Sequence, residues 1–296
     1  MKHNFGRAED ILILGAGASV DYGLPTWKEL SDLINERISN DKGEHYQYKK
    51  EILAWIGKVG VKGGYSTIDE CIAKESVSAE YHLNGHQVEN QIFQLMKDLF
   101  VEVYRANDKG WIRKLNEKIL RNQTDFVNEL GFINYNYDGV LDSNFLDFTY
   151  LPAKHQLLNF KTSLERLSKI TIETLHPHGY LFSNQELGPT HIRRHKETMK
   201  STTPGLLDAV SCHESLSHTI SNYIGEVKLY ILGLGGGLQI NLDNIQFESN
   251  VNEIHITVRD QTKKDDITKY LSKKYDVPIT DIQVHASCDE LIEKCF

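Results

Sequence analysis

The chain has 296 residues, which is enough for one substantial α/β core together with a helical insertion. Its formal net charge of −8 at pH 7 argues against a nucleic acid as the direct ligand, because affinity for phosphate backbones depends on a basic surface. The four cysteines stand singly and form no Cys-x-x-Cys pair, so the sequence indicates neither a zinc ribbon nor a disulfide framework.

The N-terminal segment before Ile11 contains no apolar run of signal-peptide length. No later run approaches the length of a membrane span. We therefore expect a cytoplasmic protein that does not bind a membrane.

The first predicted strand is the apolar run at residues 11–14, which leads into Gly-Ala-Gly-Ala-Ser at 15–19. Here the chain must turn sharply into a helix. Glycine lacks the Cβ that would block a phosphate, and the N-terminus of the following helix favours an anion. The segment therefore predicts a nucleotide-binding turn, although many such turns carry glycines for geometry alone.

The turn departs from the Gly-x-Gly-x-x-Gly pattern of dehydrogenases, because Val20 occupies the third glycine position and the next glycine is Gly23. That pattern would soon bring a second strand. A helix is predicted there instead from apolar residues at helical spacing, Leu30, Leu33, Ile34 and Ile38. A hydride-transferring dehydrogenase is thus disfavoured.

Residues 41–130 are predicted to be mostly helical and to form an insertion within a single domain that spans residues 1–296. A broad apolar face runs through Val88, Ile92, Phe93, Leu95, Met96, Leu99, Phe100 and Val103. We interpret this face as core packing.

Further strands are predicted at residues 132–136, 174–178, 228–232, 253–258 and 281–286. The polar segment 261–275 reads as a crossover helix between the last two. The fold class is therefore α/β, a Rossmann-like doubly wound parallel sheet with a helical insertion. Ligands of such sheets bind beyond the carboxyl ends of the strands.

Four segments resemble motifs of the sirtuin-like family, and they occur in the family's order. Residues 15–19 with Gly-Leu-Pro at 23–25 resemble its opening motif. Asn-Tyr-Asp at 136–138 resembles its Asn-x-Asp motif, and His178-Gly179 resembles its His-Gly motif. Residues 229–235 resemble a late strand whose glycine turn touches the cofactor.

The resemblance implies that NAD is the substrate and that its nicotinamide–ribose bond is cleaved. This bond breaks through an oxocarbenium-like centre, so the site must hold the leaving nicotinamide and steer the incoming oxygen. Asn136 suits the orientation of a water or the ribose. The resemblance assigns the nicotinamide carboxamide to Asp138 and the general base to His178. It assigns NAD binding to Gly15, Ala16, Gly17, Ser19, Pro25, Thr26, Trp27, Gly233 and Leu234.

The residues also allow plainer interpretations. Asn136 and Asp138 could cap the following helix, because both residue types are favoured at N-caps. His176 and His178 alternate along a strand and face the same side, so one of them could be structural. The His-Gly pairing selects His178.

No metal is expected. Cys212, His213, Glu214 and His218 invite such an interpretation, but His213 and His218 would diverge by about 140° on a helix. The basic run at 191–196 is interpreted as a solvated helix face.

The sequence thus predicts an NAD hydrolase that gives nicotinamide and ADP-ribose. The resemblance is to a prokaryotic branch that depletes NAD as an effector of antiphage defence. An NAD-dependent protein deacylase is disfavoured by the missing four-cysteine zinc module, and a catalytically silent nucleotide-binding or assembly module by intact Asn136, Asp138 and His178. Because constant NAD hydrolysis would poison the cell, we expect activation from outside the chain, by a separate sensor protein, by homo-oligomerisation or by a small signalling nucleotide, and we favour a partner protein.

Overall fold

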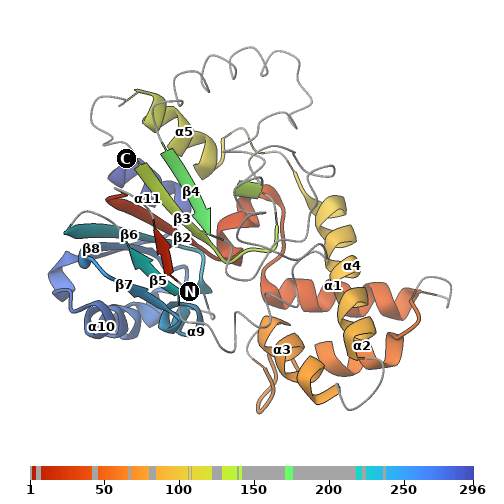
Figure 1. The fold of residues 1–296 in the computed structure, drawn as a ribbon. Helices are drawn as coiled ribbons and strands as arrows, with labels where there is room; N and C mark the ends of the chain where they lie inside the picture. The colour runs from red at the N-terminus through yellow and green to blue at the C-terminus, as the bar shows by residue number, and fades with distance from the viewer. Residues whose placement is uncertain are drawn as a thin grey trace.

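The computed structural model describes residues 2–4, 8–41, 46–65, 68–79, 85–105, 107, 109–121, 129–138, 140–141, 171–175, 218–221, 225–235 and 238–296. Its centre is a six-stranded parallel sheet in the order β4-β3-β2-β6-β8-β9 (Figure 1). The strands are β2 (Asp10–Leu14), β3 (Glu129–Asn134), β4 (Thr171–Leu175), β6 (Glu226–Leu232), β8 (Asn250–Thr257) and β9 (Ile282–His285).

Counted along the chain, these six strands lie in the order 3-2-1-4-5-6, which is the order of a doubly wound nucleotide-binding sheet. The predicted fold class is therefore confirmed. Each of the six predicted strands overlaps one of these strands, and residues 176–178 of the third one lie outside the described residues.

Both faces of the sheet are buried at β2, which explains why residues 11–14 of this strand form a continuous apolar run. Leu12 and Leu14 point into a cluster that includes α5 (Trp111–Arg121) and α11 (Cys288–Cys295). Ile11 and Ile13 point into the opposite cluster, which includes α9 (Leu238–Asp243) and α10 (Lys264–Tyr275). The polar crossover segment predicted at 261–275 corresponds to α10, preceded by a short 3-10 helix, η5 (Gln261–Lys263).

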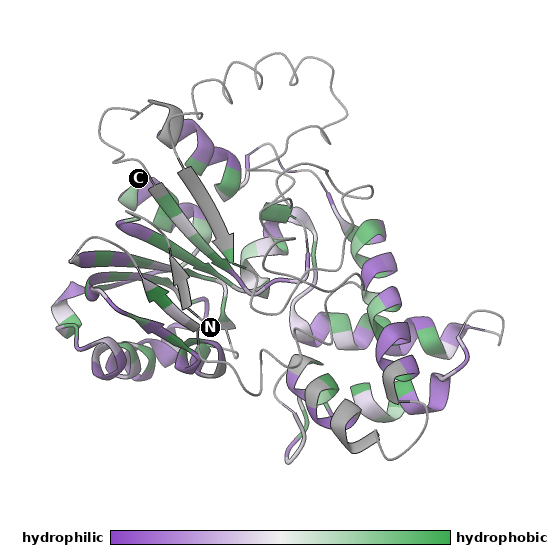
Figure 2. Ribbon diagram, viewed as in Figure 1, coloured by the Kyte–Doolittle hydropathy of each residue, from purple (hydrophilic) through white to green (hydrophobic). Residues whose placement is uncertain are grey.

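Four helices form a group beside the sheet (Figure 1). They are α1 (Trp27–Asn40), α2 (Lys49–Ile56), α3 (Ile68–Ala79) and α4 (Gly85–Val103). Hydrophobic and hydrophilic residues alternate along α4 (Figure 2), and the predicted apolar face packs inward, with Ile92, Leu95 and Met96 fully buried. Among the described residues, no helix is long and apolar enough to cross a membrane.

Two features differ from the sequence-based expectation. The chain after β2 forms a 3-10 helix, η1 (Ala16–Tyr22), and the first α-helix begins only at Trp27. A second parallel sheet, β1-β5-β7, joins three short strands that the sequence did not reveal: β1 (Lys2–Asn4), β5 (His218–Ser221) and β7 (Ile245–Phe247). A last 3-10 turn, η6 (Ile279–Asp281), precedes β9.

Candidate functional site

The candidate site lies where β2 and β6 end side by side, which is the switch point of the strand order. Leu14 pairs with Leu232 in the sheet, so the turns that start at Gly15 and Gly233 leave at the same level. The Gly15 amide donates to the Leu232 carbonyl at 2.9 Å, and the Gly17 amide donates to the Gly233 carbonyl at 2.9 Å. The two turns are thus joined directly by their backbones.

The close contact between the two turns explains why glycine occupies positions 15, 17 and 233. A Cβ on Gly15 would lie 2.7 Å from the Leu234 Cα, and a Cβ on Gly17 would lie 2.9 Å from the Gly233 Cα. Gly233 itself has a φ of 68°, and its Cβ would lie 2.1 Å from the Ala18 nitrogen. Close backbone approach therefore requires all three glycines, and the amides of Gly15 and Gly17 are bonded within the protein rather than directed to a phosphate.

The 3-10 helix η1 is held by residues at the start of α5 and just after α4. The Trp111 indole donates to the Ala18 carbonyl at 2.7 Å, and the Ile112 amide donates to the Tyr22 hydroxyl at 3.1 Å. The Arg105 amide donates to the Tyr22 carbonyl at 2.8 Å. These bonds fix the position of the turn against the helices.

Asn136 follows β3 at the same edge and reaches the turn after β2. Its side-chain amide donates to the Ser19 hydroxyl at 3.1 Å, and both residues are only 4% exposed. Its backbone amide donates to the Asn134 side-chain oxygen at 3.1 Å. The Asn136 side-chain oxygen is buried and has no hydrogen-bond partner within the described part of the chain. It is an acceptor available to a bound molecule.

Asp138 has the contact expected of a cap. Its Oδ1 accepts from the Val140 amide at 3.0 Å, at the start of a short helical segment. The capping interpretation therefore describes Asp138 but not Asn136, whose side chain bonds Ser19 instead.

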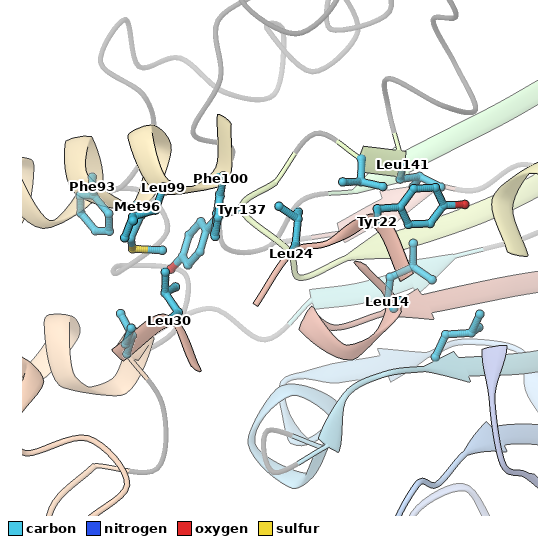
Figure 3. Packing of buried hydrophobic residues seen from close by; sticks show 14 of the residues in the cluster. Leu14, Tyr22, Leu24, Leu30, Phe93, Met96, Leu99, Phe100, Tyr137 and Leu141 are labelled. Carbon is cyan, nitrogen blue, oxygen red and sulfur yellow. The ribbon is translucent and has the colours of Figure 1, made fainter. Parts of the chain in front are cut away.

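Tyr137, between these two residues, points into the helical group, where it lies between Leu24 and the residues of α4 (Figure 3). Its ring centroid is 5.9 Å from that of Trp27 in an edge-on arrangement and 6.3 Å from that of Phe93. The loop after β3 is thus anchored on the helices on one side of Asn136.

The other predicted binding residues are partly engaged in local structure. Thr26 is the N-cap of α1 and forms a capping box with Glu29. Leu234 is buried in the core cluster that contains Ile11 and Ile13. Ala16, Pro25 and Trp27 are half-buried. His178 lies outside the described residues, as do its alternative His176, Cys212, His213, Glu214 and the basic run 191–196.

Two residues at this edge were not predicted from the sequence. Thr257 ends β8, and its hydroxyl accepts from the Gly233 amide at 2.9 Å. Arg259 follows it. Burial and Asp289 raise the pKa of the Asp21 carboxyl, and the positive charge of Arg259 opposes that rise. Their position at the end of a predicted strand beside the switch point could have indicated both.

A scan against protein-family models finds no match for this chain. A search of curated proteins also finds no match.

Proposed function

We propose that this protein cleaves the nicotinamide–ribose bond of NAD and releases nicotinamide and ADP-ribose. The observation that carries the proposal is the buried side-chain oxygen of Asn136, which has no hydrogen-bond partner among the described residues and lies beside Ser19 at the carboxyl edge of a doubly wound sheet. Leaving such an acceptor unsatisfied costs about 1–3 kcal/mol. A hydroxyl of the ribose or the attacking water would supply the missing donor.

We assign the binding of the reacting groups and the proton transfer to three side chains. Asn136 holds the water or ribose hydroxyl through its free oxygen. Asp138 accepts from the nicotinamide carboxamide, since a carboxylate that caps one amide still has further lone pairs. His178, by the sirtuin-like resemblance, accepts the proton from the attacking oxygen.

We further propose that activity in the cytoplasm is held back until a sensor protein or a second copy of the chain binds, as the resemblance to antiphage effectors implies. The group α1–α4 supplies a surface for such a partner, and the half-exposed Val101 lies on α4.

A second candidate is a nucleotide-binding or assembly module without catalysis. It is favoured by the hydrogen bonds that the Gly15 and Gly17 amides donate to Leu232 and Gly233, and by the capping bond of Asp138. Such a module would bind NAD and leave it intact.

Chromatography of NAD after incubation with the purified chain, alone and with proteins encoded beside it, separates the two candidates. Nicotinamide and ADP-ribose are expected in at least one mixture. Asn136→Ala should lower turnover about 10²–10³-fold, as loss of one positioned polar group does elsewhere. Asn116→Ala, which removes a buried asparagine from α5, is the matched control and should retain activity.

NAD that binds but stays intact in every mixture would favour the silent module. Cleavage that survives Asn136→Ala unchanged would remove Asn136 from the mechanism. Growth arrest and NAD loss on expression of the chain alone would contradict the proposed need for an activator.

A further inference from the structure

Three side chains capable of binding a metal converge where α11 meets strands β8 and β9. His255 lies on β8, His285 ends β9, and Cys295 ends α11. Their nearest ligand atoms all lie within 4.8 Å of one another. We propose that these three residues bind a zinc ion.

The proton positions around His255 argue for a cation. Its Nε2 lies 3.0 Å from a carboxylate oxygen of Glu253, which can only accept, so Nε2 carries the proton and Nδ1 carries a lone pair. Two atoms approach that one lone pair, the His285 Nε2 at 3.2 Å and the Cys295 sulfur at 3.2 Å. One lone pair cannot accept two well-aligned hydrogen bonds. A cation between the three atoms removes the conflict, because each atom then donates a lone pair to it.

The distances suit tetrahedral zinc. Zn–N bonds of about 2.0–2.1 Å and a Zn–S bond of about 2.3 Å place two nitrogens about 3.3 Å apart and a nitrogen and a sulfur about 3.6 Å apart. The nitrogens of His255 and His285 are 3.2 Å apart. The Cys295 sulfur is 3.2 Å and 3.9 Å from them, which brackets the ideal value. Imidazole and thiolate together are the ligands that zinc prefers.

The surroundings of His255 resemble the outer shell of a zinc site. Glu253 orients the imidazole in the manner of a carboxylate–histidine–zinc triad. The carboxylate is held in turn by Lys228, at 3.3 Å, and by the Gln283 amide, at 3.3 Å. Tyr230 stacks on the His255 ring with centroids 5.1 Å apart and planes 8° apart. Ring position and tautomer are thus set before a metal arrives.

The site would fasten the last helix to the sheet. His255 and His285 are 5% and 3% exposed, whereas Cys295 is half-buried. Three protein ligands leave the fourth zinc position to a water molecule on the side of Cys295. This role is separate from the proposed NAD chemistry, because none of the three ligands is a residue proposed to bind or cleave NAD.

The test is zinc binding by the full-length chain after stripping with a chelator, measured by competition with a fluorescent zinc indicator. A single equivalent should bind. Cys295→Ser should abolish tight binding, while Cys288→Ser, which changes another cysteine of the same helix, should keep the wild-type affinity. Glu253→Gln should weaken binding about 10–100-fold, as loss of an outer-shell carboxylate does elsewhere.

Cobalt gives a readout that needs no variant. Co²⁺ added to the stripped wild-type chain should produce the charge-transfer absorption of a thiolate–cobalt bond, and zinc should abolish it. The proposal is overturned if no zinc binds, if cobalt gives no such band, or if Cys295→Ser binds zinc as wild type does. Equal zinc affinity of Glu253→Gln and wild type would contradict the orientation assigned to His255.

Discussion

Two loops at the carboxyl edge of the sheet use their polar groups in opposite ways. In the turn after β2, the Gly15 amide donates to Leu232 at the end of β6 and the Gly17 amide donates to Gly233, the next residue. In the loop after β3, the side-chain nitrogen of Asn136 donates to Ser19, and its side-chain oxygen has no hydrogen-bond partner among the described residues. Gly15 and Gly17 are therefore explained by the close approach of two backbones, whereas Asn136 offers a side-chain atom that could hold a ligand.

The largest effect should come from the glycine that closes the two turns. Gly233 and Gly235 both have positive φ, 68° and 50°, but only a Cβ at 233 would meet another atom within 4 Å. Gly235→Ala should cost about 1–2 kcal/mol of unfolding free energy for backbone strain alone. Gly233→Ala should cost about 1–3 kcal/mol more for overpacking against Ala18.

Urea denaturation of both variants measures this difference. Equal losses would mean that the two turns do not pack as tightly as their hydrogen bonds indicate.

A smaller effect should separate the two roles of Asp138. Asp138→Ala removes the acceptor for the Val140 amide and should cost about 1 kcal/mol of stability. Asp138→Asn keeps an acceptor and should leave stability almost unchanged, yet it should lose NAD cleavage if the carboxylate holds nicotinamide. Full turnover in Asp138→Asn, with wild-type stability, would leave capping as the only role of the residue.

The smallest effect lies at the amino end of β2, away from both turns. Burial raises the pKa of Asp10, while the hydrogen bond from Tyr230 and the charge of Lys228 oppose that rise. A carboxyl whose folded pKa is raised contributes stability at low pH and loses it as pH rises through the folded pKa. Asp10→Asn keeps the acceptor for Tyr230, so it should be more stable than wild type at about pH 7.

That advantage should shrink as pH falls toward about 4, the ordinary pKa of aspartate. Urea denaturation at the two pH values gives the comparison. A stability difference that does not change with pH would assign it to packing rather than to ionisation.

The sequence predicted the sheet well because its strands carry the strongest local signal. The runs at 11–14 and 229–232 are buried on both faces of the sheet, and such runs are typical of central parallel strands. The spacing of Leu30, Ile34 and Ile38 likewise predicted α1. The placement of Gly15 and Gly233 at one edge followed from the parallel order alone.

The rest depends on contacts between distant residues. The 3-10 form of η1 is held by bonds from Trp111 and Ile112, about 90 residues away in the chain, which no local pattern reveals. The strands β1, β5 and β7 are too short for a periodic signal. The spacing of His255, His285 and Cys295 in the sequence is not that of a zinc motif. Only the fold brings these three residues together, so the sequence alone predicts no metal there.

The tyrosine that holds η1 makes a mechanical linkage between the helices and the glycine turn. Tyr22 receives bonds from Arg105, just after α4, and from Ile112, in the first turn of α5. A displacement of α4 must therefore drag Tyr22 or break these bonds. Gly17 lies less than two 3-10 turns from Tyr22 in the same helix η1. A displacement of Tyr22 is therefore transmitted along η1 to the hydrogen bond between Gly17 and Gly233. A protein docked on α4 would act on that junction by transmitted strain, without touching it.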